Sequence, residues 1–484
     1  MKRIQRSNKL LLIAFALLVL VQIPFLFTDP DTLADVNTRG AWIDESLYVF
    51  QAREWIDSGQ LDIAVNDAFV RSPVFQLLVS GFFLIFGTHL FAARLMTVVV
   101  VAAALAFTIS RKHTRTLGWV MAGVLFTQYH IFQFSHHSLV YMVAIAWLLF
   151  ALVFLTEAYE GYRVNRNVFL ANLFVFLAYG TSVQMLPAAV IVPAVCFILW
   201  ITRLKKPDST PWMFITAAGY SALFGLLYFL IWYLPNRNMF DTIVFFQAEG
   251  RFPTSLYEFA QTFRFNFINC LWIRKLMPYF MLAGITVLAW PFVMRKNTSL
   301  AHKAVFLFAL FWLIIEFPKT GMFYIPFRYL LGFITAMSLL VSLGITRLLQ
   351  VKAPWKYGAV VFIAAVFITN VIHAVNSWNR RTYDIEKANE IMAQRIADNE
   401  VALGAWAPAF TWDVWVKCVP VWNEYMNDDQ PIEKYRPTII VSEFNEADSD
   451  NYYSKHGYNL KEISDTITAV KVWRYDLVFY SLKK

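Results

Sequence analysis

The run LLLIAFALLVLVQIPFLF, from Leu10 to Phe27, is followed closely by RGAWIDESLYVFQAREWIDSGQ, from Arg39 to Gln60. The first run follows the basic segment MKRIQRSNK and is long enough to cross roughly 30 Å of membrane hydrocarbon as a helix. The second places two adjacent carboxylates, Asp44 and Glu45, next to that helix. Because no small-residue cleavage site follows the run, we predict an uncleaved first helix with a cytoplasmic N-terminus.

Composition extends this pattern to the whole chain. The 484 residues are 58% hydrophobic and 17% aromatic, only 15% are charged, and the mean hydropathy is +0.50. A soluble domain carries about 25% charged residues. Because a backbone in lipid must satisfy its own hydrogen bonds, the long apolar runs predict a mainly α, polytopic transmembrane helical bundle. The net charge of +9 is explained by cytoplasmic loops and outer Arg residues, with membrane lipids as partners and no nucleic acid.

Short basic clusters mark cytoplasmic loops, and placing them all inside gives about 11 spans with the C-terminus outside. The predicted spans are Leu10–Phe27, Leu90–Ser110, Thr116–Phe134, Leu139–Ala158, Val168–Gly180, Leu186–Ile201, Trp212–Leu234, Met277–Met294, Ala304–Phe317, Phe323–Thr346 and Lys356–Asn376. Ser72–Gly87 is short and broken by glycine, and counting it as a span would reverse every later loop. We predict an interfacial or re-entrant helix there, and an ordinary span that breaks the charge rule stays open.

With this topology, most of the polar segments are predicted to lie on the outer face of the membrane. Residues 1–376 form the predicted transmembrane domain, with outer loops at 28–89 and 235–276, and residues 377–484 form a small soluble α/β extracytoplasmic domain. The predicted helices of that domain are Thr382–Asn399 and Asp413–Met426, and its predicted strands are Ala402–Ala405, Thr438–Ser442, Ala469–Tyr475 and Leu477–Leu482. Its tryptophans fit a carbohydrate platform or, the favoured reading, the domain's own core; they are Trp406, Trp412, Trp415 and Trp422. Cys270 and Cys418 both lie outside, which leaves a disulfide open.

The acidic pair and three cations suggest a reaction at the outer surface. The period of a helix puts Asp44 and Glu45 on different faces. One carboxylate can therefore accept a proton while the other orients the residues of the site through hydrogen bonds. Arg71 ends the first outer loop, Lys319 lies on an outer turn, and Arg328 lies just inside a span. Arg binds phosphate through two parallel hydrogen bonds, and nearby cations stabilise charge on a departing lipid phosphate. Solvated loop carboxylates and a snorkelling lysine are the alternatives.

The order of motifs resembles the GT-C glycosyltransferases, in particular the protein O-mannosyltransferase and aminoarabinose-transferase group of family-39-type enzymes. Those enzymes carry an acidic pair after the first span, then spaced Tyr, Ala and Gly, a Lys-Pro-Pro element, an FG, an Ala-Arg-Leu and an RYLLP. The matching residues here are Asp44, Glu45, Tyr48, Ala52, Gly59, Arg71-Ser72-Pro73, Phe86-Gly87, Ala93-Arg94-Leu95 and Arg328-Tyr329-Leu330-Leu331-Gly332. The resemblance covers roughly residues 10–350. Arg71-Ser72-Pro73 and Gly332 depart from the family pattern, and the turn FSHHSLVYM carries His136 and His137 without a carboxylate.

By this resemblance, the chain is a membrane glycosyltransferase that moves a sugar from a polyprenyl-phosphate carrier to an acceptor hydroxyl on a glycan, lipid or protein. The implied reaction is a single inverting displacement, with Asp44 as general base and Glu45 orienting the site. Arg71, Arg328 and Lys319 would bind the donor phosphate. Tyr48, His136, His137 and Tyr329 are candidates for substrate contacts, although interface positions also explain the Tyr and His residues.

Two other functions stay open at this point. A transporter or flippase for a lipid-linked sugar fits the spans and cations, but it does not require the acidic pair and usually shows paired repeats, which are absent from the sequence. An O-antigen ligase or polymerase shares such substrates but would carry its long outer loop later in the chain. We predict no cofactor; a divalent metal stays open, although no Cys/His spacing of a metal site supports one. The expected location is a bacterial or archaeal cell membrane.

Overall fold

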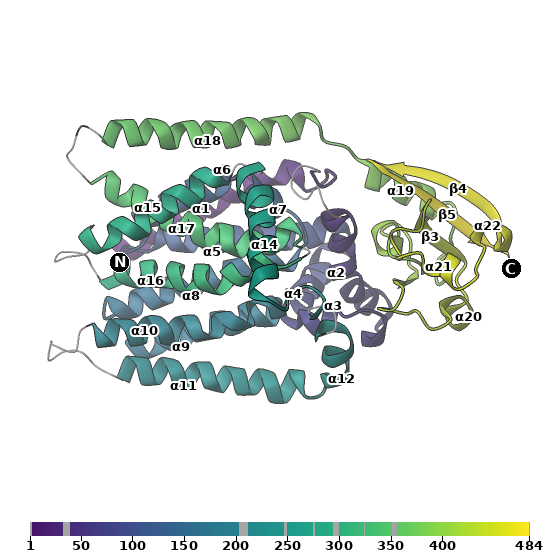
Figure 1. The fold of residues 1–484 in the computed structure, drawn as a ribbon, viewed down its shortest axis with the longest axis horizontal. Coiled ribbons are helices and arrows are strands. Elements are labelled where there is room, and N and C mark those ends of the chain that lie inside the picture. The colour runs from purple at the N-terminus through teal and green to yellow at the C-terminus, as the bar shows by residue number, and fades with distance from the viewer. Residues whose placement is uncertain are drawn as a thin grey trace.

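The structure is a computed structural model that describes residues 2–31, 39–202, 212–245, 249–273, 276–293, 300–323, 325–350, 354 and 356–483. A bundle of long helices fills one end of the molecule, and a small sheet with short helices forms the other (Figure 1). The first outer segment lies between them. This arrangement agrees with the predicted fold class of a helical membrane bundle followed by a small α/β domain.

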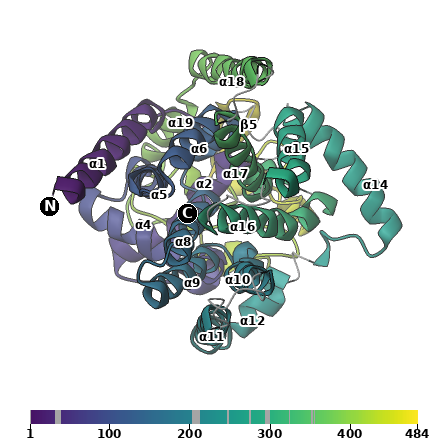
Figure 2. The ribbon, with the colours of Figure 1, turned by 90° about the vertical axis from the view of Figure 1, so that its left-hand side faces the viewer.

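The long helices of the bundle run side by side along the long axis of the molecule (Figure 1). They are α1 (Lys2–Gln22), α5 (Leu90–Ser110), α6 (Arg115–Thr127), α8 (Val140–Tyr159), α9 (Val164–Thr181), α10 (Ile191–Ile201), α11 (Trp212–Leu227), α15 (Met277–Val293), α16 (Leu300–Glu316), α17 (Leu331–Leu348) and α18 (Lys356–Asn379). Seen end-on in Figure 2, α8 lies in the middle of the bundle and α18 lies at its edge. Accordingly, α8 is buried along most of its length.

Among the described residues, eight helices are long and apolar enough to cross a membrane, and α4 (Pro73–Phe86) and Met277–Trp290 are shorter apolar helices. The chain is therefore an integral membrane protein, but the predicted count of 11 spans is not confirmed. The predicted span at Thr116–Phe134 is divided into α6 and α7 (Tyr129–Phe134). The break falls at Gln128, whose side chain accepts a hydrogen bond of 2.7 Å from the Ile131 amide and so begins a new helix.

Short helical elements connect the long helices, several of them at the end of the bundle that faces the sheet (Figure 1). They are η1 (Ile23–Phe25), α2 (Gly40–Ser58), η2 (Ile63–Val65), α3 (Ala68–Arg71), η3 (Val183–Val190), η4 (Tyr228–Tyr233), α12 (Arg237–Met239), η5 (Phe240–Phe245), α14 (Leu256–Asn266), η6 (Phe267–Ile273), η7 (Phe317–Gly321) and η8 (Phe327–Leu330). The residues predicted as an interfacial helix form α4, which packs against α2, α5 and α9. Its depth in the membrane stays a prediction.

The C-terminal sheet has five strands in the order β2-β1-β3-β5-β4, with β1 parallel to β2 and β3 and the remaining pairs antiparallel. Its elements are α19 (Asp384–Ala393), β1 (Val401–Leu403), η9 (Ala407–Ala409), β2 (Lys417–Val419), α20 (Pro431–Tyr435), β3 (Ile439–Glu443), α21 (Tyr452–Lys455), α22 (Leu460–Ile463), β4 (Ser464–Val472) and β5 (Tyr475–Leu482). After β1 the chain turns at Gly404, whose φ is +121° and where a Cβ atom would lie 2.1 Å from the carbonyl oxygen of Val441. Only glycine fits there.

One prediction for this domain is wrong. The helix expected at Asp413–Met426 is absent, and that segment contains strand β2 and turns. The cause is long-range pairing, since β2 lies parallel to β1 and is buried at its centre. No disulfide involves Cys418, which is a buried free thiol. It contacts the Thr411 hydroxyl at 3.1 Å instead.

Helix α2 is apolar on two faces because it lies between two cores. Its residues Tyr48, Val49 and Ala52 pack in the core of the bundle. On the other side, Trp42, Ile43, Leu47 and Phe50 pack in the core of the C-terminal domain. A helix that is buried all round needs no single apolar stripe. The C-terminal domain therefore fixes the orientation of the helix that carries the acidic pair.

Candidate active site

The acidic pair lies in the first turns of α2, and its two carboxylates point to different partners. Glu45 is fully buried and forms a bidentate ion pair with Arg94 of α5, with both N–O distances at 2.7 Å. The Ser138 amide donates a further hydrogen bond of 2.8 Å to Glu45, and His137 Nδ1 lies 3.7 Å from it. Burial alone would raise the pKa of Glu45, but Arg94 and His137 outweigh it and hold that pKa well below its usual range.

This buried pair fixes the position of α2. Arg94 also donates hydrogen bonds to the carbonyl groups of Leu26 and Thr28, at 3.0 and 2.6 Å, so it joins the end of the first helix to α2 and α5. Arg94 was matched to the Ala-Arg-Leu element in the sequence but was not predicted as a site residue. With its oxygen atoms engaged by these partners, Glu45 is suited to orientation rather than to proton transfer.

Asp44 points the other way and forms an ion pair with Arg328 of η8. The Asp44 side chain is 19% exposed and that of Arg328 is 7% exposed, so the carboxylate is reachable while the guanidinium is largely enclosed. Two residues that lie far apart in the sequence, at an outer loop and at the start of a span, are thus brought together as predicted. At Gly332, which replaces the last Pro of the family pattern, a Cβ atom would lie 2.6 Å from the Glu316 carboxyl carbon, so a larger residue there would need the Glu316 side chain to move.

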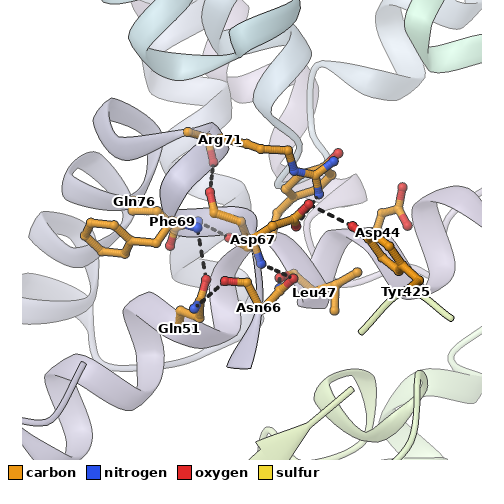
Figure 3. Close-up of polar contacts among 12 residues, drawn as sticks. Asp44, Leu47, Gln51, Asn66, Asp67, Phe69, Arg71, Gln76 and Tyr425 are labelled. Carbon is orange, nitrogen blue, oxygen red and sulfur yellow. Dashed lines mark hydrogen bonds and ion pairs between the residues drawn. The ribbon is translucent and has the colours of Figure 1, made fainter. Parts of the chain in front are cut away.

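Arg71 approaches the same place from α3. Its Nη2 lies 2.7 Å from Asp67 Oδ1, and its guanidinium lies over the ring of Tyr48, 5.5 Å from the centroid. The Tyr48 hydroxyl lies 3.2 Å from that of Tyr141. Burial raises the pKa of Tyr48 to about 12, and the charges of Arg71, Asp44 and Arg328 are all close enough to act on its phenol. Figure 3 shows Arg71 and Asp44 near Asp67.

A third arginine completes the cluster, and the sequence did not single it out. Arg251 Nη1 donates a hydrogen bond of 2.8 Å to the Tyr329 hydroxyl, and Arg328 lies over the same ring, 5.4 Å from its centroid. The charge of Arg71 is also close enough to act on Arg251. Arg251 comes from the second outer loop, where no motif marks it. Its only signal in the sequence is a charge in a segment predicted to lie outside.

We refer to Asp44, Arg71, Arg251, Arg328 and Tyr329 as the arginine cluster. The three guanidinium groups and the Asp44 carboxylate all lie close enough to the Tyr329 phenol for their charges to act on it, and guanidinium groups gathered in this way can bind an anion through charge-assisted hydrogen bonds. Because the groups are largely buried, these interactions are stronger than they would be in water. The cluster thus pairs an anion site with a proton acceptor.

Three predicted residues make other contacts. Lys319 forms an ion pair of 2.8 Å with the buried Glu316. His136 accepts or donates a hydrogen bond of 2.7 Å with Gln22 and stacks on Phe25, and burial lowers its pKa well below the usual value, so the ring is neutral. His137 lies beside Glu45. These three residues therefore pack around the site and do not belong to the arginine cluster. Among the described residues, no three metal-binding side chains come together.

The C-terminal domain reaches this region directly. The Tyr425 hydroxyl donates a hydrogen bond of 2.8 Å to Asp67 Oδ2, as Figure 3 shows, and Arg53 of α2 donates to the Thr411 carbonyl and hydroxyl at 3.1 and 2.9 Å. Trp412 Nε1 donates to the Ser46 hydroxyl at 3.1 Å. The domain thus holds both the helix that carries Asp44 and the carboxylate that pairs with Arg71.

No protein-family model matches the sequence, and no curated protein matches it. Two solved structures match over 97% of this chain and 97% of their own. One is ArnT from Cupriavidus metallidurans bound to undecaprenyl phosphate, with a TM-score of 0.59 and 13% identity. The other is the same protein in the apo state, with a TM-score of 0.58 and 14% identity. At such low identity the likeness concerns the fold, and it extends over nearly the whole chain. The chain therefore has the fold of these ArnT structures, in agreement with the fold that the order of its sequence motifs predicted.

Proposed function

We propose that this chain is a membrane glycosyltransferase that moves a sugar from a polyprenyl-phosphate carrier to an acceptor hydroxyl. The observation that carries the proposal is the ion pair of Asp44 with Arg328 beside Arg71, Arg251 and Tyr329. A solved structure of the same fold binds undecaprenyl phosphate, which supports the donor class. Fold alone does not imply function, so the residues of the arginine cluster are the main support for this proposal.

In this proposal the donor phosphate binds among the three guanidinium groups and the Tyr329 hydroxyl. Asp44 accepts the proton of the acceptor hydroxyl as its oxygen bonds to the anomeric carbon. The bond from that carbon to the phosphate oxygen breaks, its electron pair leaves with the polyprenyl phosphate, and the configuration inverts. The guanidinium groups stabilise the charge that grows on the departing phosphate. Glu45 and Arg94 position α2, and Lys319 takes no part.

The polyprenyl chain would leave the cluster along an apolar path. Leu330, Phe333 and Ile334 follow Tyr329 along η8 and α17 and line a small, mostly apolar cavity of about 20 Å³, which would have to widen to admit a prenyl chain. Phe263 and Phe267, from the second outer segment, form its other side. A chain that enters there would keep its hydrocarbon out of water while its phosphate stays at the arginines.

The arginine cluster and the C-terminal domain would face the outside of the cell. The basic N-terminal segment lies at the opposite end of the bundle from the C-terminal domain (Figure 1), which fits a cytoplasmic N-terminus. Thiol labelling tests this orientation. A Ser454→Cys variant, exposed on the C-terminal domain, should react with an impermeant maleimide in intact cells, in a background without native cysteines. If the cysteine is labelled only after the cells are lysed, the C-terminal domain faces the cytoplasm and the proposed orientation is wrong.

The deciding experiment incubates the purified protein with a panel of undecaprenyl-phosphate sugars and mixed hydroxyl acceptors. We expect loss of one donor, release of undecaprenyl phosphate and a glycosylated acceptor. An assay of the same donors in proteoliposomes distinguishes a transferase from a flippase, because a flippase would move the donor between leaflets without consuming it. Transbilayer movement with an intact donor would contradict the proposal.

A further inference from the structure

The tryptophans of the C-terminal domain differ in what their rings contact. Trp406 is buried, stacks on Phe410 and donates to Glu443 at 3.3 Å. Trp412 donates to Ser46, and the ring of Trp422 packs on Tyr425. These contacts are those of core and interface residues. They agree with the reading of the sequence in which the tryptophans build the domain itself.

Trp415 is the exception. Its side chain is 38% exposed, and among the described residues its ring makes no aromatic contact and its indole N–H donates to no protein group. Its backbone is nevertheless fixed, because the Trp415 amide donates to Asp398 at 2.9 Å and its carbonyl accepts from the Asn399 amide at 2.7 Å. A large apolar ring is thus held in place at the surface without a partner.

Trp415 forms one wall of a pocket of about 330 Å³ between the end of α2 and the C-terminal domain. Val416 adds to the apolar wall beside Trp415, and the remaining lining residues are polar and come from both units: Glu54, Ser58, Gln60, Asp62, Asn399 and Lys417. The side-chain amides of Gln60 and Asn399 bond to no other described group. The pocket therefore combines one free aromatic face with several unused donors and acceptors.

The charges of the pocket argue against an anionic ligand. The Lys417 ammonium is engaged by Asp62 at 2.9 Å, and Glu54 accepts a hydrogen bond of 2.9 Å from the Cys418 amide. Burial raises the pKa of Glu54 to about 7, so its carboxyl is partly protonated near neutral pH and adds less than a full negative charge, while Asp62 and Lys417 offset each other. A phosphate or an acidic sugar would find no free cation among the lining residues, because the one ammonium group of the pocket is already paired with Asp62.

We infer that this pocket binds a neutral or amino-bearing saccharide, with a sugar ring stacked on Trp415 and its hydroxyl or amino groups bonded to Glu54, Asp62, Gln60 and Asn399. An amphipathic aromatic ring covers the apolar face of a sugar, while carboxylate and amide groups bond its polar edge. The inference rests on the proposed function in one respect: it makes the acceptor a glycan-bearing molecule. Helix α2 carries both Asp44 and Glu54, about 15 Å apart along its axis.

The test uses the purified full-length protein in detergent and three soluble probes. They are cellotriose, which is neutral, a chitosan trimer, which carries amino groups, and trigalacturonate, which is acidic. Calorimetry or saturation-transfer NMR should detect binding of at least one of the first two, with at least tenfold weaker binding of the third. Trp415→Ala should weaken binding tenfold or more, and Trp415→Phe should retain most of it.

Phe444→Ala is the matched control, because Phe444 is another exposed aromatic residue of the same domain and lies outside the pocket. It should leave binding unchanged. Binding that survives Trp415→Ala, or no binding of any probe by the wild-type protein, would overturn the inference. Asp44→Asn should bind the probes like the wild type. If the protein consumes no donor but binds the probes in a Trp415-dependent way, the proposed function is contradicted and this inference is not. If the protein transfers sugar but does not bind the probes in this way, this inference is contradicted and the proposed function is not.

Discussion

Tyr425 of the C-terminal domain and Asp67 of the first outer segment are joined by a hydrogen bond of 2.8 Å, and the other oxygen of Asp67 pairs with Arg71 at 2.7 Å. A side chain from the soluble domain thereby supports an arginine of the proposed phosphate site, although it does not itself belong to the arginine cluster. The C-terminal domain is therefore part of the site's scaffold.

Tyr425→Phe removes only this hydrogen bond. We expect the KM for the donor to rise about threefold or more with kcat little changed, because a lost hydrogen bond to a charged group loosens Asp67 and with it Arg71. Steady-state kinetics with varied donor measure the change. Tyr435→Phe is the control, since Tyr435 bonds to Asn427 in the same domain. A fall in kcat at constant KM would contradict a positioning role.

Asp44→Asn should lower the rate of sugar transfer at least about 100-fold, because an amide cannot accept the proton of the acceptor hydroxyl. Size-exclusion chromatography and thermal unfolding of the same sample check that the protein is folded. Asp44→Glu, which keeps the carboxylate but moves it, should retain part of the activity. Full activity of folded Asp44→Asn would remove Asp44 from the mechanism.

Arg251→Ala should raise the KM for the donor about tenfold or more, because it deletes charge-assisted hydrogen bonds to the phosphate and the hydrogen bond to Tyr329. Arg251→Lys should recover part of the loss, since lysine keeps the charge but not the planar geometry. Arg264→Ala provides the control, because Arg264 lies exposed on α14 in the same outer segment. Equal effects at both positions would mean that general surface charge, not the cluster, attracts the donor.

Glu45→Gln should destabilise the protein by roughly 3–5 kcal/mol, because it leaves the buried guanidinium of Arg94 without its anion. Thermal unfolding in detergent measures the loss. Replacing both partners, as Glu45→Leu with Arg94→Met, should restore part of the stability. Arg237→Ala breaks an exposed ion pair with Asp241 and should cost less than about 1 kcal/mol. A mild effect of Glu45→Gln would show that the buried pair does not hold α2.

Asp448 predicts a pH dependence of stability. Burial, together with the charge of the neighbouring Glu443, raises the pKa of Asp448 to about 7, although hydrogen bonds from the Glu443 amide and the Ser442 hydroxyl act in the opposite direction. The folded state thus holds a proton that the unfolded state loses near pH 4, so this stability is present at low pH and is lost as the pH rises through about 7. Between about pH 5 and pH 8 the unfolding temperature should fall more steeply for the wild type than for Asp448→Asn. Parallel slopes would contradict the assignment.

The residues brought together at the arginine cluster illustrate what could be predicted and what could not. The sequence indicates Asp44, Arg71 and Arg328 because two outer loops and the outer end of a span place them on one side of the predicted membrane, and charge near lipid is costly unless it has a function. Arg251 was missed because its loop has no periodic pattern and its partner, Tyr329, lies in a span far along the chain. The incorrect prediction of a helix at Asp413–Met426 also results from a long-range contact, because the strand in that segment forms only by pairing with β1.

The sequence by itself determined the membrane class, the positions of the long helices and the sign of the charges at their ends, because each follows from local composition and from the length of an apolar run. Tertiary structure decided the roles of neighbouring residues. In the folded chain, Glu45 pairs with Arg94 and Asp44 pairs with Arg328, and α2 packs between two cores. Trp415, unlike the other tryptophans discussed, keeps its ring exposed at the surface. These outcomes depend on contacts between segments distant in the chain, and local pattern carries no information about which distant side chain a buried charge will meet.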